Sequence, residues 1–230
     1  VTEEGADASS KVSVVVPSGN FGNIYAGFLA RSMGVPIRRL ILATNENNVL
    51  EEFFTTGIYR PRSAADTLAT SSPSMDISKA SNLERFIWAL LGPEAFVQRW
   101  AELESTGTLD LRDQLPRLGE DFDFVAGTSS HDDRLKTIRS VKERSGRLID
   151  PHTADGVTVA LRTMEPGFPT LVMETAKAAK FPQTVAEALG TEPETPAVIA
   201  DLLARPQKVE TIDNEEAPLR HLIEERALTS

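Results

Sequence analysis

The six-residue stretch Ser18-Gly19-Asn20-Phe21-Gly22-Asn23 has the sharpest chemical pattern in this sequence. It follows the apolar run Val12 to Val16 and precedes a segment with helical spacing, Ile24 to Met33. The first N–H groups of a helix have no partner within the helix and carry partial positive charge, so they attract anions. Glycines let the backbone approach a ligand closely, and the serine and asparagines add polar side chains. The pattern predicts a phosphate-binding loop.

The loop differs from the common nucleotide-binding loops. It has neither the Gly-Lys-Ser/Thr of a P-loop nor the Gly-x-Gly-x-x-Gly of dinucleotide-binding folds. No lysine or arginine lies within it, so a phosphate would be bound mostly by the dipoles of the backbone. That suits a permanently bound cofactor better than a nucleotide that turns over. On local chemistry alone, a tight strand-to-helix turn without a ligand remains an alternative.

Five other residues are candidates for chemistry. Thr175 follows the apolar run Thr170 to Glu174, at the carboxyl end of a predicted strand, where α/β sheets place their ligands. On local pattern alone, it is an ordinary threonine at a strand end or helix N-cap. His152 is of the type that titrates near neutrality and is a candidate general base, but we favour a role in ordering a helix start. Ser74, Met75 and Asp76 would border a substrate, or Asp76 would simply cap a turn.

Apolar runs alternate with segments of helical periodicity along the chain, which predicts an α/β fold. Val12–Val16 and Leu40–Ala43 flank the first helix and form a strand–helix–strand unit of the size expected for a right-handed parallel crossover. Two more strands are predicted over 122–126 and 170–174. Further helices are predicted near 48–54, 83–91, 96–103, 130–146, 153–164, 183–189, 196–204 and 217–227.

Three of these helices have predicted N-terminal caps. Ser81 and Glu84 have the spacing of a capping box, and the run from Ser130 to Asp133 predicts a cap for the next long helix. Thr153 is the predicted cap of the helix that follows.

Composition excludes several classes of protein. A net charge of −10 argues against nucleic acid as a partner, because its phosphates are bound by clustered Lys and Arg. The absence of cysteine excludes disulfides and thiolate chemistry, and the three histidines are too scattered to suggest a metal site. No apolar run approaches the roughly 18 residues of a membrane span. We expect a cytoplasmic protein with no membrane partner.

Five segments together resemble threonine synthase, a pyridoxal phosphate (PLP)-dependent family of the tryptophan-synthase-β type, also called fold type II. The order and spacing of the resemblance hold from about residue 11 to the C-terminus. The segments are Val16–Asn23, Leu42–Asn45, Ser74–Ile77, Asp150–Ala154 and Glu174–Phe181.

The resemblance implies a fold and a cofactor site. The fold would be the C-terminal half of the large PLP domain, a parallel-sheet core with family insertions. The loop that wraps the cofactor phosphate in the family maps onto Gly19, Asn20, Phe21, Gly22 and Asn23. The threonine that hydrogen-bonds the pyridine nitrogen maps onto Thr175. A neutral hydroxyl there does not enforce a protonated ring, which makes the cofactor a moderate electron sink.

The same resemblance implies that the Schiff-base lysine is absent. In the family it lies in an Ala-Phe-Lys-Asp-like motif upstream of the phosphate loop. None of the seven lysines here stands in such a motif, so no catalytic residue is assigned within this sequence. They are Lys11, Lys79, Lys136, Lys142, Lys177, Lys180 and Lys208.

We therefore expect a fragment that is inactive alone and has the N-terminal half of the same enzyme as its partner. The intact enzyme would convert O-phospho-L-homoserine and water to L-threonine and phosphate by γ-elimination and β-addition of water. The expected organisation is a lead-in linker over 1–10, a partial PLP-binding α/β domain over 11–190 and a C-terminal helical extension over 191–230. The alternatives are another fold type II lyase or dehydratase, and a non-catalytic module that binds phosphate or PLP.

Overall fold

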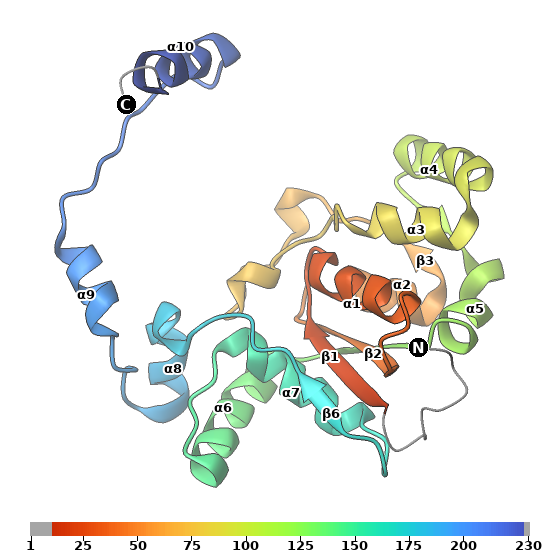
Figure 1. Ribbon diagram of the computed structural model, residues 1–230, viewed down its shortest axis with the longest axis horizontal. Coiled ribbons are helices and arrows are strands. Elements are labelled where there is room, and N and C mark those ends of the chain that lie inside the picture. The colour runs from red at the N-terminus through yellow and green to blue at the C-terminus, as the bar shows by residue number, and fades with distance from the viewer. Residues whose placement is uncertain (1–10, 228–230) are drawn as a thin grey trace. The chain divides into compact units, whose positions relative to one another are not determined.

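The computed structural model describes residues 11–227 of the chain (Figure 1). The predicted lead-in over 1–10 lies outside the described residues. The chain divides into two compact units, Val1–Pro193 and Glu194–Ser230, and each is described by itself.

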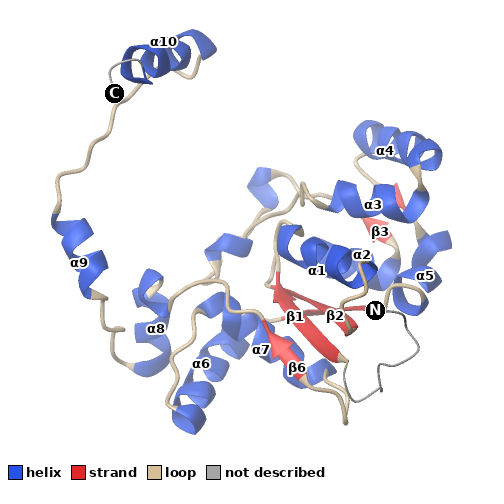
Figure 2. Ribbon diagram, viewed as in Figure 1, coloured by secondary structure: helices blue, strands red, loops and turns tan. Residues whose placement is uncertain are grey.

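A four-stranded parallel sheet forms the centre of the first unit (Figure 2). Its strands are β1 (Val12–Pro17), β2 (Ile37–Thr44), β5 (Phe124–Thr128) and β6 (Thr170–Val172). They lie in the order β5-β2-β1-β6, and every neighbouring pair is parallel. This confirms the predicted α/β class with a parallel sheet.

The two central strands are buried on both faces over Val15–Val16 and Leu40–Ala43, which explains why these segments are continuous apolar runs. Alternate residues point to opposite faces because side chains of a strand have a period of two. Val16, Leu40 and Leu42 face the larger core cluster, whereas Val15 and Ile41 face a second cluster.

Helices cover the two faces. The first face packs against α1 (Gly22–Ser32), α2 (Val49–Thr56) and α3 (Leu83–Leu91). On the other face lies α7 (Pro151–Thr163), and α6 (His131–Ser145) packs against α7 (Figure 1). The remaining elements of this unit are β3 (Ile58–Tyr59), β4 (Leu109–Asp110), α4 (Pro93–Thr106), α5 (Leu115–Glu120) and α8 (Pro182–Leu189), with short 3-10 turns at Ala64–Asp66, Pro73–Met75, Arg112–Gln114 and Ala178–Lys180.

Helix α7 approaches the sheet closely at Gly156. A Cβ on this glycine would lie 2.9 Å from Val172 Cγ1 and 3.0 Å from the ring of Pro17. Only glycine therefore fits here without displacing the ends of β1 and β6, the two strands that carry the predicted cofactor contacts.

One predicted cap is confirmed and two are wrong. Ser130 caps α6 as predicted, and the structure shows that it forms a capping box with Asp133. Ser81 does not cap α3, whose N-cap is Asn82 without a side-chain bond. Thr153 does not cap α7 either, because Pro151 starts that helix two residues earlier and Asp150 is the N-cap.

Three further differences concern short segments. The structure ends β6 at Val172, two residues before the predicted end. Neither the antiparallel pair of β3 and β4 nor α5 was predicted. Elements of two to six residues are too short to show the periodic hydrophobic pattern by which strands and helices are recognised in a sequence. These elements are buried by tertiary packing, because Leu109 and Leu118 belong to the main core cluster.

The second unit contains α9 (Ala197–Ala204) and α10 (Glu216–Ala227), which confirms the two helices predicted there. Val198, Leu202, Leu219 and Ile223 are exposed on them. Within the described residues, no helix of either unit is both long and apolar enough to cross a membrane.

Candidate functional site

The predicted site residues gather at the carboxyl edge of the sheet. Because β1 and β6 are parallel neighbours, the segments that leave them start at the same edge. Val15 pairs with Val172, and three residues beyond each are Ser18 and Thr175. The fold thus brings the glycine loop and Thr175 to one edge of the sheet, with Thr175 exposed.

Phe21 anchors the glycine loop in the core. Its φ of 63° is left-handed, and its N–H donates to Ser18 Oγ at 3.0 Å. Its ring is fully buried, with centroids 5.6 Å from Phe54 and 6.1 Å from Phe124. Neither the side chain nor the N–H of Phe21 is therefore free to contact a ligand.

The open hydrogen-bond donors of the loop lie just after Phe21, in the first turn of α1. The first bond of the helix ladder runs from Tyr25 N–H to Phe21 O at 3.1 Å. The N–H groups of Gly22 and Asn23 precede that bond, and no oxygen in residues 11–227 accepts from them. The first turn has no acidic residue, and Asn23 is exposed. This donor set suits an anion.

A second segment, residues 72–82, lies over the loop. A Cβ on Gly19 would come within 2.8 Å of Met75 O, so this position requires glycine. Asn20 Oδ1 accepts from the Ser81 N–H at 2.6 Å and the Ser81 hydroxyl at 2.9 Å. These bonds replace the predicted capping role of Ser81, and no hydrogen bond from the amide nitrogen of Asn20 is found within residues 11–227.

Asp76 holds that segment on the end of β2. Its carboxylate accepts from Asn45 Nδ2 at 2.8 Å, from Asn47 Nδ2 at 3.0 Å and from the Thr70 N–H at 2.8 Å. These bonds favour an ordering role for Asp76 over contact with a substrate.

His152 is buried at the start of α7 and bonds on both ring nitrogens. Its Nδ1 lies 2.7 Å from Asp150 Oδ1, and its Nε2 accepts from the Ser74 N–H at 3.0 Å. Burial acts to raise the pKa of Asp150, but hydrogen bonds from His152 and Thr153 outweigh it and hold that pKa below its usual range. The contacts favour the interpretation that His152 orders the helix start.

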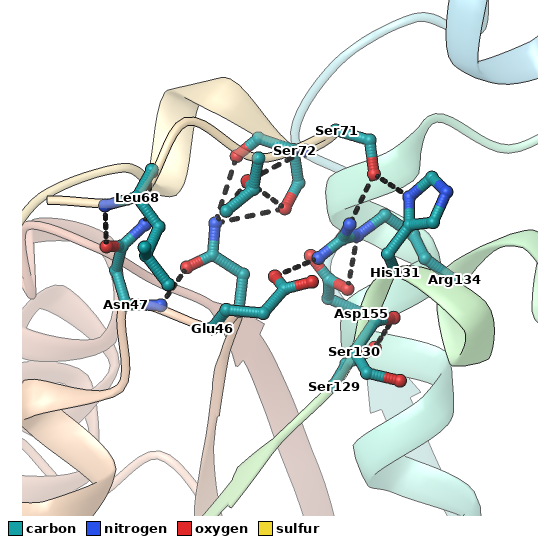
Figure 3. Close-up of polar contacts among 12 residues, drawn as sticks. Glu46, Asn47, Leu68, Ser71, Ser72, Ser129, Ser130, His131, Arg134 and Asp155 are labelled. Atoms are coloured by element: carbon teal, nitrogen blue, oxygen red, sulfur yellow. Dashed lines mark hydrogen bonds and ion pairs between the residues drawn. The ribbon is translucent and has the colours of Figure 1, made fainter.

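A buried ion cluster that the sequence analysis missed joins Arg134 of α6 to Asp155 of α7 and to Glu46, which follows β2 (Figure 3). Arg134 is fully buried and donates from Nε to Asp155 at 2.8 Å and from Nη2 to Glu46 at 2.7 Å. Its Nη1 donates to Ser71 Oγ. Burial raises the pKa of Asp155 to about 6, against the opposing effect of Arg134. The sequence held one signal that Arg134 is buried. It lies four residues before the core residue Ile138, so both side chains are on the same face of the helix.

His131 links this cluster to a cleft of about 620 Å³. Its Nδ1 lies 2.7 Å from Ser71 Oγ, and its Nε2 lies 2.9 Å from Glu187 Oε1. The cleft is lined by Thr70, Ser71, Pro73, Lys180, Phe181, Pro182, Gln183, Thr184 and Glu187. Across residues 11–227, no group of three His, Asp or Glu side chains has the arrangement of a metal site.

Comparison with known proteins shows that this chain is similar to threonine synthases. A family described as "Threonine synthase, C-terminal" matches residues 153–223. The chain is 50% identical to a threonine synthase of Methylobacillus glycogenes over 224 residues, covering 96% of this chain and 47% of that protein. It is 49% identical to a threonine synthase of Corynebacterium glutamicum, with the same coverage. The chain is a threonine synthase homologue.

Solved threonine synthase structures share its fold. The PLP-bound threonine synthase of Brucella melitensis matches with a TM-score of 0.85 at 36% identity, over 96% of this chain and 47% of that chain. The yeast enzyme matches with a TM-score of 0.83 at 32% identity. The chain spans about half the length of the curated relatives it matches, which are PLP enzymes of threonine biosynthesis.

All seven lysines of this threonine synthase homologue are exposed, including Lys180 at the cleft. The open N–H groups of Gly22 and Asn23, on a helix without an acidic first turn, have the chemistry that a phosphate monoester requires. The residues present therefore fit the phosphate of PLP.

Proposed function

We propose that this chain is the part of a threonine synthase that binds the phosphate and the ring nitrogen of PLP. The whole enzyme would convert O-phospho-L-homoserine and water to L-threonine and phosphate. The observation that carries the proposal is the set of open donors at the start of α1, at the carboxyl edge of the sheet. The 50% identity to a named threonine synthase supports this reaction over that of another fold type II lyase or dehydratase.

The loop residues hold the phosphate tail in distinct ways. The N–H groups of Gly22 and Asn23 donate to its oxygens, reinforced by the partial positive charge of the helix start. The amide nitrogens of the Asn20 and Asn23 side chains add donors. Gly19 and Phe21 contribute by shaping the loop, because Gly19 packs under Met75 and Phe21 is fixed in the core.

Thr175 contacts the other end of the cofactor. Its hydroxyl hydrogen-bonds the pyridine nitrogen. Unlike a carboxylic acid, the hydroxyl does not transfer a proton to that nitrogen. When bound, PLP supplies the electron sink for removing protons from the carbons of the amino-acid substrate. Thr175 therefore tunes that sink, from a position three residues after the end of β6.

The lysine that carries the cofactor comes from outside this chain, so the chain alone is inactive. The support is that its seven lysines are all exposed and none lies in the glycine loop. The N-terminal half of the same enzyme would supply the lysine and most of the substrate phosphate contacts, and a cytoplasmic location suits the biosynthetic role. Residues 11–190 form the partial PLP-binding domain in this proposal, and residues 191–230 are its C-terminal helical extension.

Borohydride reduction tests this division of labour. The chain of 25.1 kDa and a longer protein that contains it are each incubated with PLP, reduced and weighed as intact proteins. Reduction fixes a Schiff base as an adduct of about 231 Da. We expect one adduct on the longer protein, on a lysine outside this chain, and no stoichiometric adduct on the chain alone. A stoichiometric adduct at one of the seven lysines would refute the proposal.

A pair of variants tests Thr175 in the longer protein. Thr175→Val keeps the shape and removes the hydroxyl, whereas Thr175→Ser keeps the hydroxyl. We expect Thr175→Val to lower kcat by about tenfold and to shift the cofactor absorption band, because one hydrogen bond is lost. Thr175→Ser should retain most of both. Equal behaviour of the two variants would exclude the proposed contact.

A further inference from the structure

His152 links the start of α7 to the segment that lies over the glycine loop. Its Nε2 accepts the Ser74 N–H at 3.0 Å, a contact between residues 78 positions apart. Its Nδ1 faces Asp150 Oδ1 at 2.7 Å, and Asp150 also accepts the backbone N–H of His152 at 3.0 Å. The imidazole is 2% exposed. It is held from one side by the helix N-cap and holds the turn at Ser74 on the other.

The next residue of that turn rests on the glycine loop. Met75 is buried, and its O and Cα lie 2.8 and 2.9 Å from where a Cβ on Gly19 would stand. The Met75 N–H donates to Ser72 O at 3.0 Å, so the turn is internally bonded. A displacement of Ser74 therefore moves Met75, which in turn releases Gly19.

Only one neutral form of His152 makes both contacts. Nε2 must be unprotonated to accept the Ser74 N–H, so Nδ1 carries the proton and donates it to Asp150. Asp150 is the acid that faces the imidazole directly. The ring of Phe181 packs edge-on at 4.7 Å, and Lys180 Nζ lies 5.9 Å from the centroid of that same ring.

We propose that His152 is a positioning residue for the phosphate loop: its neutral imidazole holds the Ser74–Met75 turn against Gly19 and thereby fixes the loop in its phosphate-binding shape. This deepens the proposed function and rests on it. His152 touches neither cofactor nor substrate in this role. Loss of the His152 side chain should therefore weaken binding of the cofactor phosphate and leave binding of the pyridine ring unchanged.

Two substitutions separate the two ring nitrogens. In His152→Asn the side-chain amide stands near the position of Nδ1, so the bond to Asp150 is kept and the acceptor for Ser74 is lost. In His152→Gln the side chain reaches the position of Nε2, so an acceptor for Ser74 is kept. His131→Asn is the matched control, because His131 bonds to Ser71, which directly precedes the segment over the glycine loop and is not among the residues that touch Gly19.

The readout is the ratio of affinities for PLP and for pyridoxal, which lacks the phosphate, in the longer protein that contains this chain. We expect His152→Asn to weaken PLP binding by about tenfold, which corresponds to the loss of one well-placed hydrogen bond. Pyridoxal binding should change by less than about twofold. His152→Gln should recover most of the ratio, and His131→Asn should leave it at the wild-type value.

Other outcomes separate this inference from the proposed function. If His152→Asn weakens PLP and pyridoxal equally, or weakens neither, the positioning role is refuted. If the wild-type protein binds PLP no better than pyridoxal, the proposed phosphate site itself fails. Should His152→Asn not fold, Gly19→Ala takes its place, because its Cβ pushes the same contact from the loop side. Gly19→Ala must then lower the ratio, and an unchanged ratio would refute the inference.

Discussion

Replacement of Arg134 by methionine should destabilise the chain more than any exposed charge substitution. The guanidinium and Asp155 are both fully buried, and their closest atoms lie 2.8 Å apart. Arg134→Met leaves the carboxylates of Asp155 and Glu46 facing a hydrocarbon side chain. One fully buried acid, Asp155, and one half-buried acid, Glu46, then lack this counter-charge.

The structure gives the scale of the loss. Two unit charges 2.8 Å apart attract by about 6 kcal/mol at an effective dielectric constant of 20. Removing one partner of a buried pair typically costs about 3–5 kcal/mol, because the other charge stays desolvated. We therefore expect the free energy of unfolding at pH 7 to fall by about 3–5 kcal/mol in Arg134→Met. Replacing both partners, in Arg134→Met/Asp155→Leu, should recover a large part of this loss.

The pH dependence has a definite sign. The pKa of Asp155 is raised from 3.8 to about 6 by burial, so the native state binds this proton more tightly than the unfolded state. The contribution of Asp155 to stability is therefore fully present below about pH 4 and is lost as the pH rises to about 6. Asp155→Asn should abolish this decline. In Arg134→Met the decline should extend above pH 6, because the opposing charge is gone.

Urea unfolding followed by circular dichroism, between pH 4 and 8, measures these effects. Arg144→Met on the same helix is the control, since Arg144 is exposed and its loss should cost less than about 0.5 kcal/mol. A loss below about 1 kcal/mol in Arg134→Met, or a double variant less stable than the single one, would refute the reasoning.

Three further predictions use the same measurement or a titration. Phe21→Ala should cost about 3–5 kcal/mol, because it empties a fully buried aromatic site; a loss below about 1 kcal/mol would contradict the packing seen here. Ser130→Ala should cost about 1 kcal/mol by breaking the capping box of α6, whereas Ser81→Ala, at a wrongly predicted cap, should leave the helix content unchanged. Burial raises the pKa of Tyr59 to about 12, so ultraviolet titration should show one of the two tyrosines ionising near that pH. The free energy of unfolding should fall as the pH rises from about 10 to about 12. If both tyrosines ionise near pH 10, the burial of Tyr59 is contradicted.

The sequence by itself determined the local architecture of this protein. Val12–Val16 and Leu40–Ala43 are apolar on both faces, so they had to be strands buried between two layers. The glycine loop between β1 and α1 was readable because glycine spacing and a helix start are properties of adjacent residues. The capping box at Ser130 was readable for the same reason, since its two partners lie three residues apart.

Tertiary structure decided what each polar residue near the site bonds to. Ser81 has a capping-box spacing, yet its bonds go to Asn20, 61 residues away. Arg134 meets Glu46 across 88 residues, and His152 meets Ser74 across 78. Such partners come together only when strands from distant parts of the chain join one sheet edge. Local spacing carries no information about that meeting, because burial and the choice of partner are set by the packing of the whole sheet and its helices.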